Sequence, residues 1–453
     1  MRFKVATYTS LRLKRTTLVY VLLSTLILNL ISASVTGAVN GLVVVKPETV
    51  GMSSERLQRV TKRMQGYIDQ GQVAGAVTLI ARRGKIVHHE AQGFRNREQK
   101  VPMQKDDIFV IMSMTKPIVS TGLMMLYEEG KFLLSDPISK WLPEFEKAQV
   151  KVADGQGGSK LVPARPITVR HILTHTAGFS TGLAAPSAPT PGGVRGAAED
   201  GSPAQTPRTL RDRVKLIAAS PLNFQPGEKW EYGSATDVVA ALAEVLSGMN
   251  MDDYLRERIF KPLGMTDTHY NVPEAKKSRR PIVYAPQPDG TIKPQPPPPA
   301  NRPPTTVFGG VAGLSSTAAD YFKFAQMVLN GGEYNGVRLL SPKTIDLMIT
   351  NHIGDLMVTL KGPGYGFGLG YSVLMDSGKT TESLTPGSFG WGGAWGTYYF
   401  VDPVEELIGI VMIQVTTYRH INLRQDLGTL AMQAIIEPKS SGNQKIRGYA
   451  QIK

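Results

Sequence analysis

Ser113 and Lys116 stand three positions apart in the run Ser113-Met114-Thr115-Lys116, which leads into a long apolar stretch. If that stretch is a helix, the two side chains lie on one face and the lysine amine can hydrogen-bond the serine hydroxyl. Desolvation between two lobes would favour the uncharged amine as a base, and the helix N-terminus would direct backbone N–H groups at an oxyanion. The spacing alone is weak, because a chain of this composition contains about one such pair by chance. A solvent-exposed Ser and Lys is the plainer interpretation of this pair.

Tyr232 lies in the run Glu231-Tyr232-Gly233-Ser234, directly before a predicted helix. Ser234 would cap that helix, with Asp237 in its first turn. A tyrosine at such a position can present its phenol to a cleft and share a proton with a nearby lysine. The alternative is a core tyrosine, which is the more common role for an isolated residue of this type.

Glycines surround two tryptophans near the end of the chain, in the run Gly390-Trp391-Gly392-Gly393-Ala394-Trp395-Gly396. Glycines at a strand start allow a substrate acyl group to approach backbone N–H groups closely. A β-bulge or a tight turn beneath two packing tryptophans would have the same composition, so the run alone leaves both interpretations open.

The elements that would position these residues follow from the apolar periodicity. Residues 54–69 are predicted to form an amphipathic helix, 75–89 a hairpin, and 116–129 a buried helix that ends at Gly130. Residues 366–373, 394–401 and 407–413 are predicted strands, and 423–436 a helix. Residues 176–207 and 280–304 read as long Gly- and Pro-rich loops. Strands at both ends around a helical middle predict one sheet layer with helices, a helical lobe, and a cleft between the two.

The three motifs, in this order and at these separations, resemble the serine β-lactamase and DD-peptidase (penicillin-binding-protein-like) superfamily, and within it the class C-like esterase branch. Ser113 and Lys116 match its Ser-x-x-Lys motif, Tyr232 matches the tyrosine of Tyr-x-Asn, and Trp391-Gly392-Gly393 stands where lactamases carry Lys-Thr-Gly and several esterases carry Trp-Gly-Gly. The resemblance extends from about residue 54 to 436. Supporting runs are at 167–178, 262–265 and 313–320.

The resemblance implies a role for each matching residue. Ser113 would be the acylated nucleophile, and Lys116 with Tyr232 would act as base and acid. The backbone N–H groups of Ser113 and Ala394 would form the oxyanion hole, with Trp391 in the pocket wall and Gly392, Gly393 and Ser234 beside the substrate. It implies an α+β fold with a mixed, mostly antiparallel sheet flanked by helices and a helical lobe. The catalytic domain would span 39–437, its α/β lobe about 54–112 and 305–437, and its helical lobe about 113–304.

Two departures from the family pattern bear on the substrate. Ser234 replaces the usual Asn, and Trp391 replaces the Lys or His that would bind a carboxylate. An indole offers one donor and no charge, so it is a poor anchor for a lactam or peptide carboxylate. We therefore expect a metal- and cofactor-free serine hydrolase for small carboxylic esters or related acyl compounds. β-Lactamase or D-Ala-D-Ala carboxypeptidase activity, or a non-catalytic cell-wall-binding protein, are the alternatives.

The bulk properties set the context for this activity. Residues 1–38 combine five basic residues with an apolar run at 17–31 and then small residues, which predicts a signal peptide and an exported, periplasmic or secreted protein, or a membrane-anchored one if the signal is retained. Five of the charges behind the net +14 lie in this segment, and the others are scattered apart from the run at 276–280 and the tail from residue 439. No aromatic residues interleave with them, so no nucleic-acid partner is expected, whereas contact with the cell envelope is compatible with them. The tail 438–453 is predicted to be disordered, and the oligomeric state is left open.

Several other patterns point to chemistry that the context rejects. The chain has no cysteine, which excludes disulfides and thiol chemistry. His171 and His175 have the spacing of a zinc-binding helix, but the following residue, Ile172, stands where the base would be glutamate, so packing and loop anchoring are favoured. Lys379-Thr380-Thr381 imitates Lys-Thr-Gly without the glycine, and no Gly-x-Ser-x-Gly elbow occurs.

Overall fold

The computed structural model describes residues 42–179, 207–297, 303–416 and 421–438. The predicted signal segment at 1–38, most of the loop at 176–207, and the tail from residue 439 lie outside these ranges, so their predictions stay predictions. In the described ranges, no helix combines the length and the apolar character that a membrane crossing requires.

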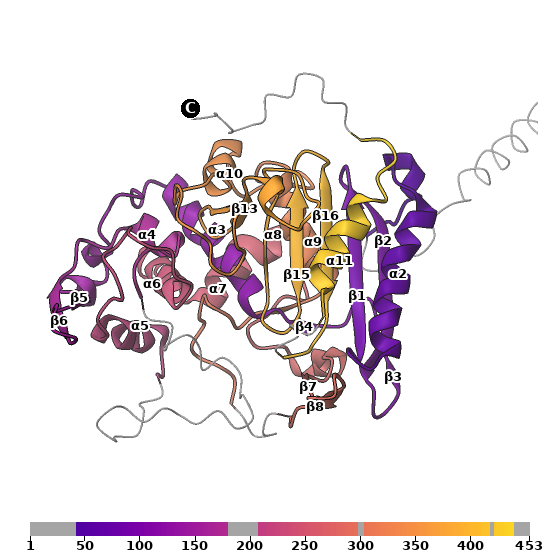
Figure 1. The fold of residues 1–453 in the computed structure, drawn as a ribbon, viewed down its shortest axis with the longest axis horizontal. Coiled ribbons are helices and arrows are strands. Elements are labelled where there is room, and N and C mark those ends of the chain that lie inside the picture. The colour runs from indigo at the N-terminus through magenta and orange to yellow at the C-terminus, as the bar shows by residue number, and fades with distance from the viewer. Residues whose placement is uncertain (1–41, 180–206, 298–302, 417–420, 439–453) are drawn as a thin grey trace, which may run out of the picture.

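One large sheet forms the centre of the described structure, with eight strands in the order β12-β13-β14-β15-β16-β1-β2-β3. Every pair of neighbouring strands in it is antiparallel, so the mixed sheet that we expected is antiparallel throughout its named strands. Its strands come from both ends of the chain, as the colours in Figure 1 show. They are β1 (Gly75–Arg82), β2 (Lys85–Asn96), β3 (Val101–Pro102), β12 (Tyr365–Phe367), β13 (Ser372–Leu374), β14 (Phe389–Gly392), β15 (Tyr398–Asp402) and β16 (Leu407–Met412).

Helices cover both faces of this sheet. On one face α2 (Ser54–Asp69) lies beside α11 (Leu423–Met432), while α9 (Ala318–Leu329) packs behind β1 and β16 (Figure 1). The α2 bounds match the predicted helix, because Ser53 caps its N-terminus and an apolar stripe including Leu57, Val60 and Met64 is buried.

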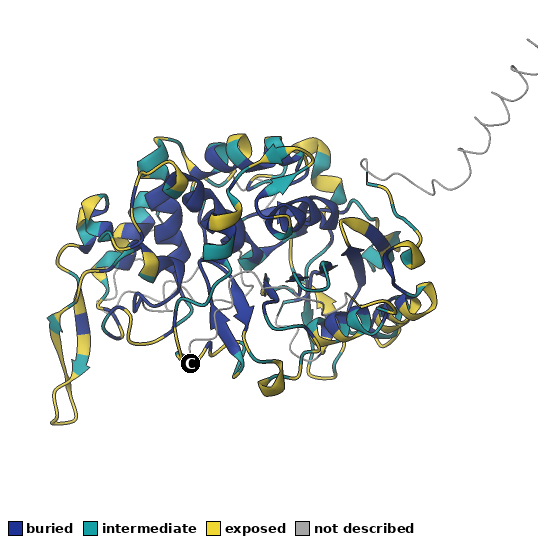
Figure 2. Cartoon of the chain, turned by 90° about the horizontal axis from the view of Figure 1, so that it is seen from above, coloured by how far each residue is buried: buried dark blue, intermediate teal, exposed yellow. Residues whose placement is uncertain are grey.

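The middle of the chain supplies a group of helices next to the sheet. They are α3 (Thr115–Glu128), α4 (Val169–Leu173), α5 (Leu210–Ala219), α6 (Ala235–Ser247), α7 (Met251–Leu255) and α8 (Lys261–Leu263), with a π-helical turn at Arg256–Phe260. Every residue of α3 from Thr115 to Leu126 is buried, as its apolar sequence predicts. A hairpin of β5 (Gln149–Ala153) and β6 (Ser159–Pro163) extends from this part, largely exposed in Figure 2.

The final third differs from the sequence prediction in two strands. The predicted strand at 366–373 is two strands, β12 and β13, because Gly370 adopts a left-handed φ of 96° between them. The predicted strand at 394–401 begins only at Tyr398, because residues 393–396 form a turn in which the Gly396 N–H donates to the Gly393 carbonyl at 3.3 Å. Both errors concern glycines whose conformation depends on their neighbours.

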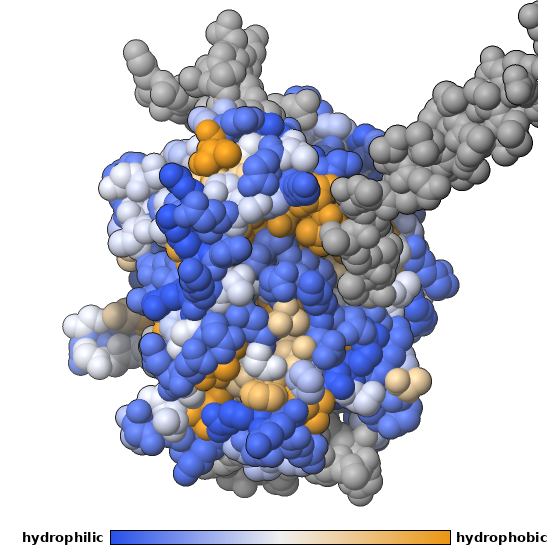
Figure 3. Space-filling view, turned by 90° about the vertical axis from the view of Figure 1, so that its right-hand side faces the viewer, coloured by the Kyte–Doolittle hydropathy of each residue, from blue (hydrophilic) through white to orange (hydrophobic). Residues whose placement is uncertain are grey.

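Short elements complete the described structure. They are the pairs β4 (Phe109–Val110) with β9 (Ser315–Ser316), β7 (Tyr284–Pro286) with β8 (Ile292–Pro294), and β10 (Glu333–Tyr334) with β11 (Val337–Arg338), the helix α10 (Pro342–Met348), and the 3-10 turns Pro47–Val50, Met112–Met114, Ile138–Lys140, Pro143–Phe145, Glu274–Arg279 and Ser377–Lys379. β7 and β8 place a small hairpin in the predicted loop at 280–304. The face in Figure 3 is mostly hydrophilic, with apolar side chains in small separate areas.

Candidate active site

Ser113 and Lys116 lie at the junction of the 3-10 turn η2 (Met112–Met114) with helix α3. The Lys116 Nζ donates to the Ser113 Oγ at 3.2 Å and to the Val311 carbonyl at 2.8 Å. The lysine side chain is almost fully buried, with 2% exposure, whereas Ser113 is partly exposed. A hydroxyl that a substrate can reach therefore lies against an amine that is shielded from water.

The backbone before Ser113 has an unusual conformation. Met112 has a φ of 47°, in the left-handed region that costs a non-glycine residue of order 1–3 kcal/mol. Ile111 holds the segment on both sides: its N–H donates to the Leu314 carbonyl at 3.0 Å, and its carbonyl accepts from the Thr397 Oγ1 at 3.2 Å. The surrounding structure thus imposes the turn that presents Ser113.

Tyr232 joins the first motif to the third. The Lys116 Nζ lies 4.5 Å from the centroid of the Tyr232 ring, and the Tyr232 hydroxyl accepts from the Trp391 Nε1 at 3.3 Å. The three motifs, more than 270 residues apart at their extremes, therefore meet in space. The detail differs from our expectation, because the amine lies over the face of the ring while the hydroxyl bonds to the indole.

The start of α6 behaves differently from the prediction. Ser234 occupies the N-cap position, but its side chain makes no capping hydrogen bond, and its buried Oγ has no partner among the described residues. Asp237 bonds elsewhere: its Oδ1 accepts from the Val311 N–H at 3.0 Å, and its Oδ2 lies 2.8 Å from the Arg213 Nε without the alignment of a hydrogen bond. Asp237 thereby fixes the residue whose carbonyl holds Lys116, a connection that no local motif reveals.

The sheet side of the site is built by the end of β14 and the turn that follows it. The Gly393 N–H donates to the Thr397 carbonyl at 2.8 Å. A Cβ at Gly393 would lie 2.1 Å from the Thr397 Oγ1 and 2.5 Å from the Ile111 carbonyl, so only glycine lets this turn approach the Ser113 segment so closely. Ala394, the predicted oxyanion donor, is exposed in the same turn.

Aromatic rings surround this junction. The ring centroid of Tyr232 lies 4.9 Å from that of His175 and 5.3 Å from that of Trp391. The ring centroids of Phe367 and Trp391 are 5.5 Å apart. Burial lowers the pKa of His175 to about 3, and the nearby charge of Lys116 adds to the effect, so His175 is a neutral ring at pH 7. The wall is therefore apolar and uncharged, with the Trp391 N–H as one of its polar groups.

The two histidines with zinc-like spacing have structural contacts. The His171 Nδ1 accepts from the Thr168 N–H at 3.1 Å and completes the N-terminal cap of α4, while His175 packs in the aromatic wall. The described ranges contain no cluster of three or more His, Cys, Asp or Glu residues placed to bind a metal ion.

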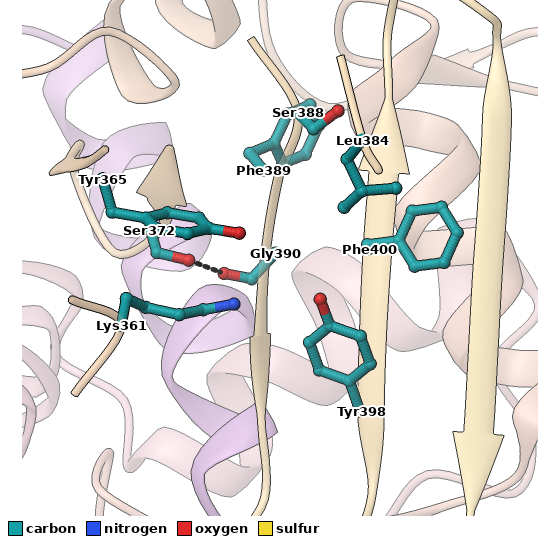
Figure 4. Close-up of a pocket in the computed structure, with 9 residues that line it drawn as sticks. All are labelled: Lys361, Tyr365, Ser372, Leu384, Ser388, Phe389, Gly390, Tyr398 and Phe400. Carbon is teal, nitrogen blue, oxygen red and sulfur yellow. Dashed lines mark hydrogen bonds between the residues drawn. The ribbon is translucent and has the colours of Figure 1, made fainter. Parts of the chain in front are cut away.

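A partly buried lysine, Lys361, lies beside β14 (Figure 4). Lys361, Tyr365, Ser388, Gly390 and Tyr398 are among the residues that line a cavity of about 10 Å³, which is the room of a single water. Burial lowers the pKa of Lys361, and Glu382 pairs with its amine at 3.3 Å. The cavity is too small for a substrate and lies apart from Ser113, so it is not a second active site.

Similarity to known proteins identifies the family to which this chain belongs. The family model described as Beta-lactamase matches residues 59–429. The chain belongs to the beta-lactamase family. A protein of Mycobacterium tuberculosis is 34% identical over 358 residues, covering 76% of this chain and 87% of its own, and the esterase EstB of Burkholderia gladioli is 29% identical over 378 residues, covering 79% and 90%. The solved structure of EstCE1, described as a hydrolase with promiscuous acyltransferase activity, has 27% identity and a TM-score of 0.70, covering 84% of this chain and 99% of that one.

The fold and the family expected from the motifs are thereby confirmed. This beta-lactamase family chain has the sheet, the flanking helices and the helical part that the family resemblance implied. Four of the predicted site residues also lie close together in the structure: Ser113, Lys116, Tyr232 and Trp391.

Proposed function

We propose that this chain is a serine hydrolase that cleaves small carboxylic esters through a covalent acyl–Ser113 intermediate. The observation that carries the proposal is the 3.2 Å contact between the Lys116 Nζ and the partly exposed Ser113 Oγ, with the neutral Val311 carbonyl as the second acceptor of the amine. The esterase EstB and the hydrolase EstCE1, to which the chain is similar, support the same reaction class.

In acylation the Lys116 amine acts as the base: it takes the Ser113 hydroxyl proton as the oxygen attacks the ester carbonyl. The backbone N–H groups of Ser113 and Ala394 bind the negative charge that develops on the carbonyl oxygen. The tetrahedral intermediate then collapses, the ester C–O bond breaks, and the proton passes from Lys116 to the leaving alkoxide, with Tyr232 beside the transfer path. The alcohol leaves and the acyl group stays on Ser113.

Deacylation reverses these roles. Water attacks the acyl carbon and gives a proton to Lys116, and the second tetrahedral intermediate expels the Ser113 oxygen, which regains that proton. The products are a carboxylic acid and free enzyme, so each turnover consumes one water and one ester bond. No step requires a metal ion or cofactor.

The substrate is an ester with an uncharged acyl part. Trp391 and its ring neighbours form an apolar wall, and Ser234 is buried at 0% exposure and has no amide group with which to hold a substrate. A β-lactam or D-Ala-D-Ala peptide carries a carboxylate that this wall does not anchor. We therefore expect turnover of p-nitrophenyl butyrate to exceed that of nitrocefin and of a D-Ala-D-Ala peptide.

A fluorophosphonate probe tests the nucleophile directly. The purified protein should be labelled on the peptide that contains Ser113, and Ser113→Ala should abolish both labelling and p-nitrophenyl butyrate hydrolysis. Ser120→Ala is the matched control, because Ser120 is buried on the same helix and should keep both. Labelling that survives in Ser113→Ala would refute the assignment.

We also propose that the protein is exported. The basic start, the apolar run at 17–31 and the small residues that follow support a cleaved signal segment. Without its five basic residues the net charge is about +9 (14 − 5), which suits a location at the anionic cell envelope. N-terminal sequencing of the protein recovered from an expressing cell's envelope and medium would test it: a mature chain that begins near residue 39 supports cleavage, and recovery of the intact chain from the cytosol contradicts export.

A further inference from the structure

Arg424, the second residue of α11, reaches the end of β14. Its Nη2 donates to the Gly393 carbonyl at 2.9 Å, and its Cζ lies 5.3 Å from the centroid of the Tyr398 ring. The guanidinium lies directly against Gly392, where a Cβ would come within 2.3 Å of the Arg424 Cζ. The glycine pair thus has a second function, because the missing side chain at Gly392 admits the arginine.

The bond from Arg424 acts on the peptide unit that contains the Ala394 N–H. The described backbone contains no cis peptide bond, so the Gly393 carbonyl and the Ala394 N–H point in opposite directions in one plane. A cation bound to the carbonyl therefore fixes the direction of the N–H. It also polarises the amide and makes the N–H a stronger donor.

Two other bonds hold the same turn, and of these only the bond from the Gly396 N–H reaches the carbonyl of this peptide unit. The Gly393 N–H donates to the Thr397 carbonyl at 2.8 Å, and the Gly396 N–H reaches the Gly393 carbonyl at a longer 3.3 Å. The charge-assisted bond from Arg424 to this carbonyl is shorter than the bond from the Gly396 N–H, and it comes from outside the turn. It therefore has the larger effect on the orientation of the Gly393–Ala394 peptide.

From these contacts we infer that Arg424 is a positioning residue for the oxyanion hole: it orients and polarises the Gly393–Ala394 peptide so that the Ala394 N–H faces the Ser113 acyl carbonyl. The inference rests on the proposed esterase function. Arg424 itself does not touch the substrate, and its effect is confined to steps in which negative charge develops on the carbonyl oxygen.

A role in anchoring α11 does not require Arg424, since other residues attach this helix to α2. Arg63 pairs with Asp426 at 2.6 Å, and Arg56 donates to the Gln433 carbonyl at 2.9 Å. Arg56→Gln is therefore the matched control, because it removes an arginine-to-carbonyl bond at the other end of the same helix.

The test compares Arg424→Gln, Arg424→Lys and Arg56→Gln with wild type on p-nitrophenyl butyrate and on the matching thionoester, whose sulfur accepts hydrogen bonds poorly. Arg424→Gln should lower kcat for the ester about 10- to 100-fold, less than the loss of an oxyanion donor itself. KM and the melting temperature should change little, and the preference for ester over thionoester should shrink. Arg424→Lys, which keeps the positive charge, should recover part of kcat, and Arg56→Gln should keep wild-type kcat and preference.

A second variant removes the contact while keeping the arginine. Gly392→Ala places a Cβ where the guanidinium lies and should reproduce the loss of ester preference. A folded Arg424→Gln with wild-type kcat, or one that loses ester and thionoester turnover equally, would overturn the positioning role and leave the esterase function intact. Absence of ester turnover in wild type would overturn both.

Discussion

The helical half and the sheet half of the candidate site contribute different kinds of chemical group. The helical half contributes side chains, with Lys116 at 2% exposure beneath Ser113 and Tyr232 beside them. The sheet half contributes backbone, through a glycine turn that packs against Ile111 and exposes Ala394. In the helical half, turnover should depend on which side chains are present. In the sheet half, it should depend on how closely neighbouring residues pack against the glycine turn. Substitutions in each half can test this difference.

The largest effect is expected in the helical half. Lys116→Ala removes the proposed base, so kcat/KM for an ester should fall about 10²- to 10⁴-fold. Lys361→Met is the matched control: it removes a partly buried lysine that pairs with Glu382 beside a water-sized cavity. It should keep turnover at some cost in stability. Equal losses of activity in the two variants would show that Lys116 acts only through packing.

In the sheet half, backbone approach should matter most. Gly393→Ala forces a Cβ to within 2.1 Å of the Thr397 Oγ1, and such overpacking costs about 1–3 kcal/mol of unfolding free energy. Turnover should fall by about 10- to 100-fold as the oxyanion turn moves away from Ser113. Gly66→Ala, in α2 with open space around it, should retain wild-type activity and equal or higher stability. A wild-type kcat in Gly393→Ala would show that the position of this turn does not affect catalysis.

Asp237 tests whether the helical half depends on support behind Lys116. Asp237→Asn removes the charge that faces Arg213 and weakens the hold on Val311, so kcat should fall about 10-fold, in line with one charge-assisted contact. Asp107→Asn weakens a partly buried pair, with Arg95 at 2.8 Å, that includes none of the candidate site residues. It should lower stability and leave kcat unchanged. Parallel kinetics and thermal melts of the two variants distinguish positioning from general stability.

Trp391→Phe should have a smaller effect, because it keeps an aromatic ring in the wall and removes only the 3.3 Å bond to the Tyr232 hydroxyl. A single neutral hydrogen bond is worth about 1 kcal/mol, so kcat should fall about fivefold. Ester KM should stay close to wild type. A loss as large as that of Lys116→Ala would instead make this bond part of the proton path.

The free energy of unfolding at acid pH should depend on buried histidines in both the sheet part and the helical part of the protein. Burial lowers the pKa to about 4 for His88, His89 and His171 and to about 3 for His175. The unfolded chain binds these protons from about pH 6.5 downward, before the folded chain does, so stability should fall as the pH drops from about 6.5 toward 4. Thermal melts from pH 7.5 to 4.5 measure this fall, and His175→Phe should reduce it. A melting temperature that stays constant across the range would contradict it.

The sequence predicted best where one local pattern decides the outcome. The helix at 54–69 was correct to the residue because Ser53 and a regular apolar stripe define it. Predictions failed where glycines were involved: 366–373 became two strands, and the strand expected from Ala394 starts at Tyr398. A glycine's conformation is set by whatever packs against it, which the local sequence does not encode.

The candidate site shows the same division. Ser113, Lys116, Tyr232 and Trp391 were identified from residue type, order and spacing, which together also determined the family. Ser234 was expected to cap α6 and does not. Arg213, Val311 and Arg424 were missed, because each acts through a contact with a different segment of the chain that no local motif reveals.

The sequence by itself determined which groups are available for chemistry: a hydroxyl and an amine one helical turn apart, a phenol, and a glycine-rich turn with an indole in place of a cation. Only the tertiary structure decided how they are held. It buries Lys116 against the Val311 carbonyl, places the Tyr232 ring beside the amine, and sets Arg424 behind the Gly393 peptide. The physical reason is that hydrogen-bond direction and burial belong to neighbours in space, and these neighbours lie up to 195 residues apart along the chain.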